Sequence, residues 1–337
     1  MKVSPSQGWL DNAGSFDTIA PHFAKAGIVV VAVDPPGSGL SEHLPPATMH
    51  MDRKIAVLSH FSFCRLQDIV LKQFCTSAVP VAEARTIVEV ADTLAQGDTA
   101  WAEPFLLFGH SRGGGISTIA AAGFPDRISG LVVCESGLGL SYETGVTRLE
   151  SFRAGYETER SYAARSGRVF ESFEAAVAQN QKEMMKNDRT ARNIVSRHIR
   201  ETDGRWGESR WVEGKWVEGA WEEGGWQIQH DERQKARGFG GWRCGIVFSE
   251  EVNARHLEAI DCPVLLVQAK RDGAAGGAQR SNEANLARIK DVVRKEVKGL
   301  HHVHSDRPAA VAGGLVLPWL AEKLGAPLGV GGAASKL

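Results

Sequence analysis

One serine in this chain stands in a sequence context that suits a nucleophile. In the stretch "FLLFGHSRGGGI" (residues 105–116), a short apolar run leads directly into the letters G-H-S-R-G. The spacing G-x-S-x-G after such a run predicts a sharp strand-to-helix turn, a nucleophile elbow, with Ser111 at its apex. The alternative is an ordinary glycine-rich turn with a solvated serine. Catalysis also requires a base, an acid and oxyanion donors elsewhere in the chain.

The candidates for the base come late in the chain, in "GLHHVHSDRP" (residues 299–308). His301 follows a predicted strand on a loop that can reach Ser111, so we predict that it is the general base, with His302 as the alternative. Together with His304, these close histidines are also compatible with a metal site. Because no cysteine or carboxylate cluster joins them at ligand spacing, we predict that the chain binds no metal and needs no cofactor.

The candidate acid lies just beyond the apolar run in "CPVLLVQAKRDG" (residues 262–273). There the carboxylate of Asp272 could hold His301 in the required tautomer and stabilise the imidazolium that forms. The alternative is that Asp272 and Gly273 only make a turn, as such pairs often do. Glu135, at the end of "LVVCE", is the second candidate acid. The order nucleophile, acid, base along the chain differs from the two common protease orders.

Short apolar runs, separated by helical patterns, predict the elements that would position these side chains. They are nearly continuous in valine, isoleucine and leucine, which is typical of parallel strands covered by helices on both faces. The runs lie at residues 27–34, 104–110, 129–136, 262–270 and, more weakly, 293–299. The alternation predicts an α/β fold with a mainly parallel sheet flanked by helices.

The chain divides into a core with an insertion and a tail. We predict a core in two parts (residues 1–136 and 258–324), a helical lid (137–257) and a flexible tail (325–337). Inside the lid, tryptophan recurs every five residues across 205–226, a period of neither helix nor strand. We expect a low-complexity loop there, the alternative being an aromatic binding surface.

A second unusual segment, residues 54–81, precedes a helix that is predicted to begin near Glu83. It is expected to be either an added helix or extra sequence.

Composition excludes several classes of partner. The 337 residues carry a formal net charge of −1, so there is no electrostatic case for binding nucleic acid or an anionic membrane. No apolar run is long enough to span a bilayer.

The five cysteines are widely spaced and odd in number, which favours free thiols in a reducing compartment. The first residues, "MKVSPSQGWL", contain no apolar leader, so we do not expect secretion.

These segments resemble the α/β-hydrolase superfamily and, more narrowly, the serine hydrolase-like proteins, a peroxisome-associated branch. The resemblance is carried by "GWLDNAGSFDTIAP", "VAVDPPGSGLSEH", "GHSRGGG", "CPVLLVQAKRDG" and "HHVHSDRP". It implies that the backbone N–H groups of Trp9 and Arg112 form the oxyanion hole. The family has a His-Gly pair before this loop, whereas this chain has Gln7 and Gly8. Only "MKVSPS" precedes the pair, so we expect the N-terminal strands to be missing, as in a truncated product.

The expected function is that of a serine hydrolase. A Ser-His-Asp triad of Ser111, His301 and Asp272 would cleave an ester or thioester of a small to medium acyl substrate through an acyl-enzyme. The alternative is a catalytically impaired or non-catalytic relative that acts as a binding protein.

A prediction about location follows from the last three residues. Ser335, Lys336 and Leu337 match the carboxy-terminal signal that the peroxisomal import receptor reads. The preceding segment is rich in glycine and alanine and should leave this tripeptide accessible. A fluorescent protein fused to the amino end is expected to colocalise with a peroxisomal marker, and removal of Leu337 should make it diffuse. Diffuse fluorescence from the intact fusion would instead support a cytoplasmic protein with a chance tripeptide.

Overall fold

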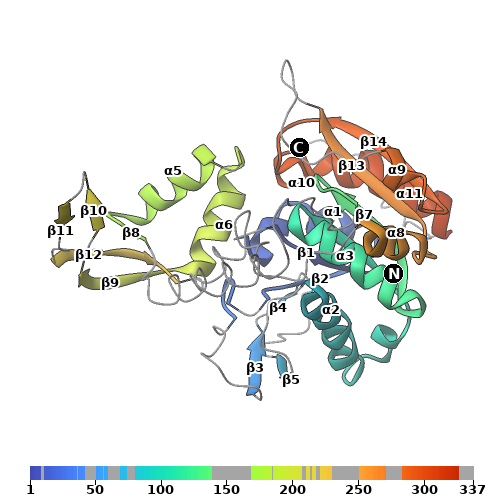
Figure 1. Ribbon diagram of the computed structural model, residues 1–337, viewed down its shortest axis with the longest axis horizontal. Helices are drawn as coiled ribbons and strands as arrows, with labels where there is room; N and C mark the ends of the chain where they lie inside the picture. Colours follow the sequence, from blue (N-terminus) through green and yellow to red (C-terminus); the bar gives the residue numbers. More distant parts are fainter. Residues whose placement is uncertain are drawn as a thin grey trace.

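The core of the protein is a seven-stranded sheet with the strand order β14-β13-β7-β6-β1-β2-β4 (Figure 1). The computed structural model describes residues 1–8, 11–35, 37–41, 51–55, 57–59, 69–73, 80–138, 168–183, 185–206, 210–212, 215–217, 221–229, 250–270 and 283–325. Trp9, Asp272 and residues 335–337, for which the sequence predicts roles, lie outside these ranges.

Neighbouring strands of this sheet run parallel, except that β2 and β4 are antiparallel. The strands are β1 (Lys2–Ser6), β2 (Val29–Val33), β4 (Val57–Ser59), β6 (Phe105–His110), β7 (Ile128–Cys134), β13 (Val264–Lys270) and β14 (Val292–Lys298). All five strands predicted from apolar runs are present. The predicted α/β fold with a mainly parallel sheet is confirmed.

Helices cover both faces of the sheet because its strands are apolar on both sides. In β6, Phe105 and Leu107 belong to one buried cluster, while Leu106 and Phe108 belong to the other. The first cluster includes residues of α2 (Pro80–Ala95), α3 (Arg112–Gly123), α8 (Glu250–Glu258) and the 3-10 helix η2 (Thr99–Ala102), and Leu286 of α9 (Glu283–Leu286) packs against it. The second includes residues of η1 (Ala13–Phe16), α1 (Ala20–Lys25), α10 (Val303–Asp306), the π-helical η5 (Ala309–Val316) and α11 (Leu317–Leu324). A further 3-10 helix, η3 (Pro125–Arg127), leads into β7.

The predicted absence of a strand ahead of Gln7 is wrong. The first residues form β1, which pairs with β2 on one side and β6 on the other. Five residues suffice because β2 is itself only five residues long and β6 six. Pro5 lies within β1 opposite Phe108. Its ring removes a single N–H donor, which the rest of the two ladders tolerates.

An insertion between β7 and α8 combines helices with a small antiparallel sheet of order β8-β12-β9. Figure 1 shows it to one side of the core. Its elements are β8 (Val169–Phe170), α5 (Phe173–Glu183), α6 (Asp188–His198), β9 (Ile199–Trp206), β10 (Arg210–Val212), β11 (Lys215–Val217) and β12 (Trp221–Ile228). The lid predicted to be helical therefore also contains strands.

The tryptophan repeat forms antiparallel strands, so the predicted low-complexity loop is wrong. Trp211 of β10 pairs with Trp216 of β11, and Trp206 of β9 pairs with Trp221 of β12. A repeated segment folds back on itself through backbone hydrogen bonds, which do not require one apolar face. The five-residue period therefore did not exclude strands.

The described residues between 54 and 73 are also strands rather than an added helix. β3 (Met51–Ile55) pairs with β5 (Ile69–Gln73), and β4 extends the main sheet. Helix α2 begins at Pro80, three residues before Glu83. No helix in the described residues is both long and apolar enough to cross a membrane.

The insertion is fixed to the core by polar contacts. Asn12 Nδ2 donates to the carbonyl of Ile194 in α6 at 2.8 Å. Asn187 Nδ2 donates to the carbonyl of Ser305 in α10 at 3.0 Å. The insertion therefore contacts both the loop after β1 and the segment after β14.

A substitution at Gly113 should destabilise the fold. A Cβ atom there would lie 2.2 Å from the Ser6 carbonyl oxygen, so β1 or α3 would have to move. We expect Gly113→Ala to lower the free energy of unfolding by about 1–3 kcal/mol, measured by urea denaturation. Gly123, at the end of the same helix, has nothing within 4 Å of its added Cβ. Gly123→Ala should therefore be neutral or stabilise by up to about 1 kcal/mol. Equal effects of the two changes would contradict the steric explanation.

Candidate active site

Ser111 stands at the turn that joins β6 to α3, with φ of 50° and ψ of −123°. A positive φ is uncommon for a serine and stores backbone strain. The turn is possible because glycines stand two residues before and two residues after Ser111, at Gly109 and Gly113. A Cβ atom on Gly109 would lie 2.5 Å from the Cα atom of Gly114. The G-x-S-x-G spacing thus corresponds to the sharp strand-to-helix turn that it predicts.

His301 brings a base to this serine. Its Nε2 atom lies 2.9 Å from Ser111 Oγ, and its side chain is 32% exposed, so a substrate can approach the pair. His302, the alternative base, is fully buried and directs its Nε2 to Asp11 instead. Of the two candidates, His301 is the one in contact with Ser111.

The described carboxylate beside His301 is that of Glu135, the second candidate acid. Its Oε2 atom lies 3.4 Å from His301 Nδ1, and its Oε1 atom accepts a hydrogen bond from the N–H of Ala269. Glu135 follows β7 with φ of 51° and is 4% exposed. Asp272 lies two residues beyond β13 and outside the described residues. The described geometry therefore joins Ser111, His301 and Glu135.

Of the two predicted oxyanion donors, Arg112 is described and Trp9 is not. Arg112 is the first residue of α3, where a backbone N–H has no partner within the helix. Its guanidinium makes two hydrogen bonds of 2.6 Å to the carboxylate of Glu83 in α2. This bidentate ion pair links the start of α3 to α2, and the Arg112 guanidinium is paired with a carboxylate.

Behind the pair of Ser111 and His301 lies a cluster of buried polar side chains that no motif in the sequence connects. Asp11 Oδ2 lies 3.0 Å from His302 Nε2 and 3.6 Å from His110 Nδ1. His110 Nε2 lies 2.9 Å from the His301 carbonyl oxygen. Asp11 and His110 stand next to motif residues, but no spacing rule connects positions this far apart.

Burial and neighbouring charges shift the titration of this group. Burial would raise the pKa of Asp11, but His302 and His110 together hold that pKa well below its usual range. Burial lowers the pKa of His110 to about 4, against the raising effect of Asp11. Burial also lowers the pKa of His304 well below its ordinary value. At neutral pH, Asp11 is therefore ionised, while His110 and His304 are uncharged.

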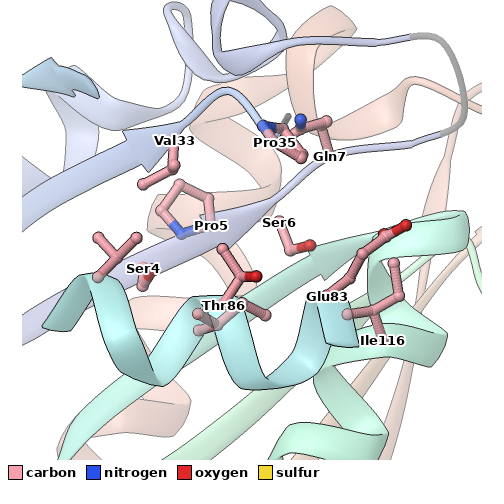
Figure 2. Close-up of a pocket in the computed structure, with 11 residues that line it drawn as sticks. Ser4, Pro5, Ser6, Gln7, Val33, Pro35, Glu83, Thr86 and Ile116 are labelled. Atoms are coloured by element: carbon pink, nitrogen blue, oxygen red, sulfur yellow. The ribbon is translucent and has the colours of Figure 1, made fainter. Parts of the chain in front are cut away.

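A separate hollow lies between α2 and the strands β1 and β2 (Figure 2). Its apolar lining consists of Pro5, Val33, Pro35, Ile87, Val90 and Ile116. Gln7 also lines it, and its Nε2 atom is buried with no hydrogen-bond partner among the described residues. The lining does not include Ser111, His301 or Glu135.

The buried neutral histidines predict that stability falls in mild acid. His110 and His304 regain a pKa near 6.5 when the chain unfolds, so the unfolded state binds more protons below that pH. The free energy of unfolding should be fully present above about pH 6.5 and fall by up to about 1.4 kcal/mol per pH unit for each group toward pH 4. Urea denaturation at several pH values measures this slope. His304→Phe, in a site lined by Phe16 and Phe108, should reduce it, and an unchanged slope would contradict the assignment.

Comparison with known proteins agrees with this geometry. A profile of the alpha/beta hydrolase fold family matches residues 7–308. A serine hydrolase-like protein of Dictyostelium discoideum is 25% identical over 318 residues, covering 92% of this chain and 72% of that protein. A serine hydrolase-like protein of Danio rerio is 27% identical over 209 residues, covering 58% of this chain and 51% of that protein.

Solved structures show the same fold. A hypothetical protein from Pseudomonas aeruginosa superimposes with a TM-score of 0.65 at 22% identity, over 96% of this chain and 90% of that one. The thioesterase domain from the curacin biosynthetic pathway superimposes with a TM-score of 0.60 at 18% identity, over 94% and 90%. The narrower resemblance to the serine hydrolase-like proteins is confirmed by the two relatives. The chain belongs to the alpha/beta hydrolase fold family.

Proposed function

We propose that this protein is a serine hydrolase that cleaves an ester or thioester of a small to medium acyl substrate. The observation that carries the proposal is the 2.9 Å contact between His301 Nε2 and Ser111 Oγ. A serine hydroxyl is a weak nucleophile until a neighbouring base accepts its proton. The strained turn at Ser111 presents that hydroxyl at the carboxyl end of β6, where a substrate carbonyl can reach it.

The reaction would proceed in two halves. Ser111 Oγ attacks the acyl carbonyl while its proton passes to His301 Nε2, which then protonates the departing alcohol or thiol. A water molecule next attacks the acyl-enzyme, His301 accepts its proton, and the acid and free serine are released. The N–H groups of Arg112 and Trp9 are the proposed donors to the tetrahedral oxyanion, as the family resemblance implies.

The acid of the proposed triad is either Asp272 or Glu135. Glu135 is supported by its 3.4 Å distance to His301 Nδ1, a contact that can shorten when a substrate binds. Asp272 is supported by its position directly after β13 in the sequence. Either carboxylate would stabilise the imidazolium by accepting a hydrogen bond from Nδ1.

The proposed chemistry bears on the need for a cofactor, and one structural neighbour bears on the kind of substrate. The reacting groups need no cofactor, since acyl transfer uses only a nucleophile, a base and oxyanion donors. Among the structural neighbours is a thioesterase domain, which supports acyl thioesters as substrates alongside simple esters. The competing proposal is a non-catalytic relative that binds such compounds without turnover.

A fluorophosphonate probe tests the nucleophile directly. We expect the protein to be labelled and to hydrolyse p-nitrophenyl esters, and Ser111→Ala to abolish both. His301→Ala should lower kcat by about a thousandfold or more, because the serine then loses its base. As a matched control, Ser196→Ala removes an exposed serine in α6 and should behave as wild type. A folded wild-type protein that is not labelled would favour the non-catalytic alternative.

The same assay distinguishes the two acids. Glu135→Gln and Asp272→Asn are compared at saturating substrate, and the true acid should lose much more of kcat than the other. A large loss from both changes would show that neither carboxylate acts alone. A fully active His301→Ala paired with an inactive His302→Ala would overturn the assignment of the base.

A further inference from the structure

Three buried polar side chains that the proposed reaction does not use lie directly behind His301. They are Asp11, His110 and His302, with exposed fractions of 5%, 0% and 0%. They come from the loop after β1, the last residue of β6 and the segment before α10. We propose that Asp11 is a positioning residue for the general base. Through its hydrogen bond with His302 it holds the loop that carries His301 within reach of the nucleophile, while His110 holds the same loop at the His301 carbonyl. This inference rests on the proposed function.

The hydrogen-bonding capacity of each group fixes its tautomer. A carbonyl oxygen can only accept, so the 2.9 Å contact with the His301 carbonyl requires the proton of neutral His110 to reside on Nε2. Its Nδ1 atom is then unprotonated. This agrees with the 3.6 Å distance from His110 Nδ1 to Asp11 Oδ2, which is too long for a hydrogen bond. The described donor to Asp11 is therefore His302 Nε2 at 3.0 Å.

The loop after β1 is shaped to bring Asp11 to this position. A Cβ atom on Gly8 would lie 3.0 Å from Asp11 Oδ2 and 3.1 Å from His110 Nδ1. A side chain at this position would require the carboxylate and the imidazole to shift by a few tenths of an ångström. The backbone N–H of Asp11 donates to the Gly8 carbonyl at 3.3 Å, which closes the turn.

The contacts hold the base loop at two consecutive residues. His110 binds the carbonyl of His301, and Asp11 binds the side chain of His302. The carbonyl of His302 in turn accepts the N–H groups of Ser305 and Asp306, both at 2.9 Å, at the start of α10. The backbone that carries the His301 ring is thus fixed on both sides. A displacement of about 1 Å in such a reacting pair lowers rates by about 100-fold.

A metal ion is the competing occupant of this cluster. A carboxylate and two imidazoles are common zinc donors, and their ligand atoms lie within 4.8 Å of one another. The 3.0 Å distance from Asp11 Oδ2 to His302 Nε2, however, is that of an ordinary hydrogen bond. The tautomers above satisfy this contact and the His301 carbonyl without an ion. The observations therefore favour a hydrogen-bonded network.

The test compares the rate and the endpoint of fluorophosphonate labelling in Asp11→Leu, which removes the acceptor of His302 Nε2, whereas Asp11→Asn would keep an oxygen that can accept the same N–H. A positioning role predicts a rate constant 10- to 100-fold lower with an unchanged labelled fraction, because the fold persists while the base is misplaced. For ester hydrolysis, kcat should fall by a similar factor with KM nearly unchanged. A wild-type labelling rate would overturn the proposal. A wild-type rate with a reduced labelled fraction would also overturn it, since Asp11 would then serve folding alone.

Asp34→Leu is the matched control. Asp34 is a fully buried aspartate that accepts hydrogen bonds from the N–H groups of Ala13 and Leu40 at 2.7 and 2.9 Å. None of its described hydrogen bonds or ion pairs involves a histidine of the network. It should lower thermal stability without slowing labelling, and an equal slowing in both variants would overturn a specific role for Asp11.

Further measurements keep the proposal testable if Asp11→Leu does not fold. His302→Gln retains an N–H near the Nε2 position and should label faster than His302→Leu, so equal rates would count against the network. Nitrogen-15 spectra of the wild-type histidines should show His110 protonated on Nε2, and protonation on Nδ1 would overturn the assignment. Stoichiometric zinc in the purified wild type, absent from Asp11→Asn, would replace the network with a metal site. Failure of wild-type labelling would disprove the hydrolase proposal, while the spectra would still test the network.

Discussion

The approach of helix α3 to the end of strand β1 sets the position of everything around Ser111. At Gly113 the helix comes so near that a Cβ atom would meet the carbonyl oxygens of Ser6 and Gln7 at 2.2 and 2.5 Å. On its other side, a Cβ atom on Gly114 would lie 2.6 Å from Ser136 Cβ. The start of the helix is therefore confined between the end of β1 and the segment that follows β7, the two strands on either side of β6. Ser111 adopts its positive φ because the chain must reverse sharply to enter this space.

Parallel strands explain why the other groups converge on this turn. Their carboxyl ends share one edge of the sheet, so residues that follow different strands meet there although they are distant in the sequence. Glu135 follows β7 and His301 follows β14, and both lie beside the serine that follows β6. Glu135 also has a positive φ, so two strained residues stand at adjacent strand ends. Such strain persists where the surrounding structure over-determines the backbone, which is typical of functional sites.

Burying the polar residues around His110 costs folding free energy, while their contacts fix the positions of neighbouring loops. A carboxylate and several imidazoles removed from water are less favourable than an apolar filling unless each finds a partner. Asp11, His302 and the Nε2 atom of His110 have such partners, whereas His110 Nδ1 and both ring nitrogens of His304 have none among the described residues. The insertion adds contacts to the same region. Asn12 donates to the carbonyl of Ile194 in α6, and Ser305 accepts from Asn187, the residue before α6. Residues that follow β1, the segment around His301 and the insertion are thus held together.

Strands, the turn at Ser111 and the loop with His301 could each be predicted from a short stretch of sequence. Continuous apolar runs identified five strands of the main sheet, since a strand buried on both faces must be apolar at every position. Glycine spacing identified the turn at Ser111, because that backbone leaves no room for side chains. The loop after the last strand likewise indicated His301. Each of these inferences depends on residues within one short segment.

Contacts between residues that are distant in the sequence are known only from the three-dimensional fold. Strand β1 is short and contains proline, and it is recognisable as a strand only from the gap it fills between β2 and β6. The tryptophan repeat pairs as strands because backbone hydrogen bonding needs no periodic apolar face. The contact of Glu135 with His301, and the assembly of Asp11 with His110 and His302, link segments separated by up to 291 positions. No pattern along the chain encodes these contacts, because they arise from the order of strands in the sheet.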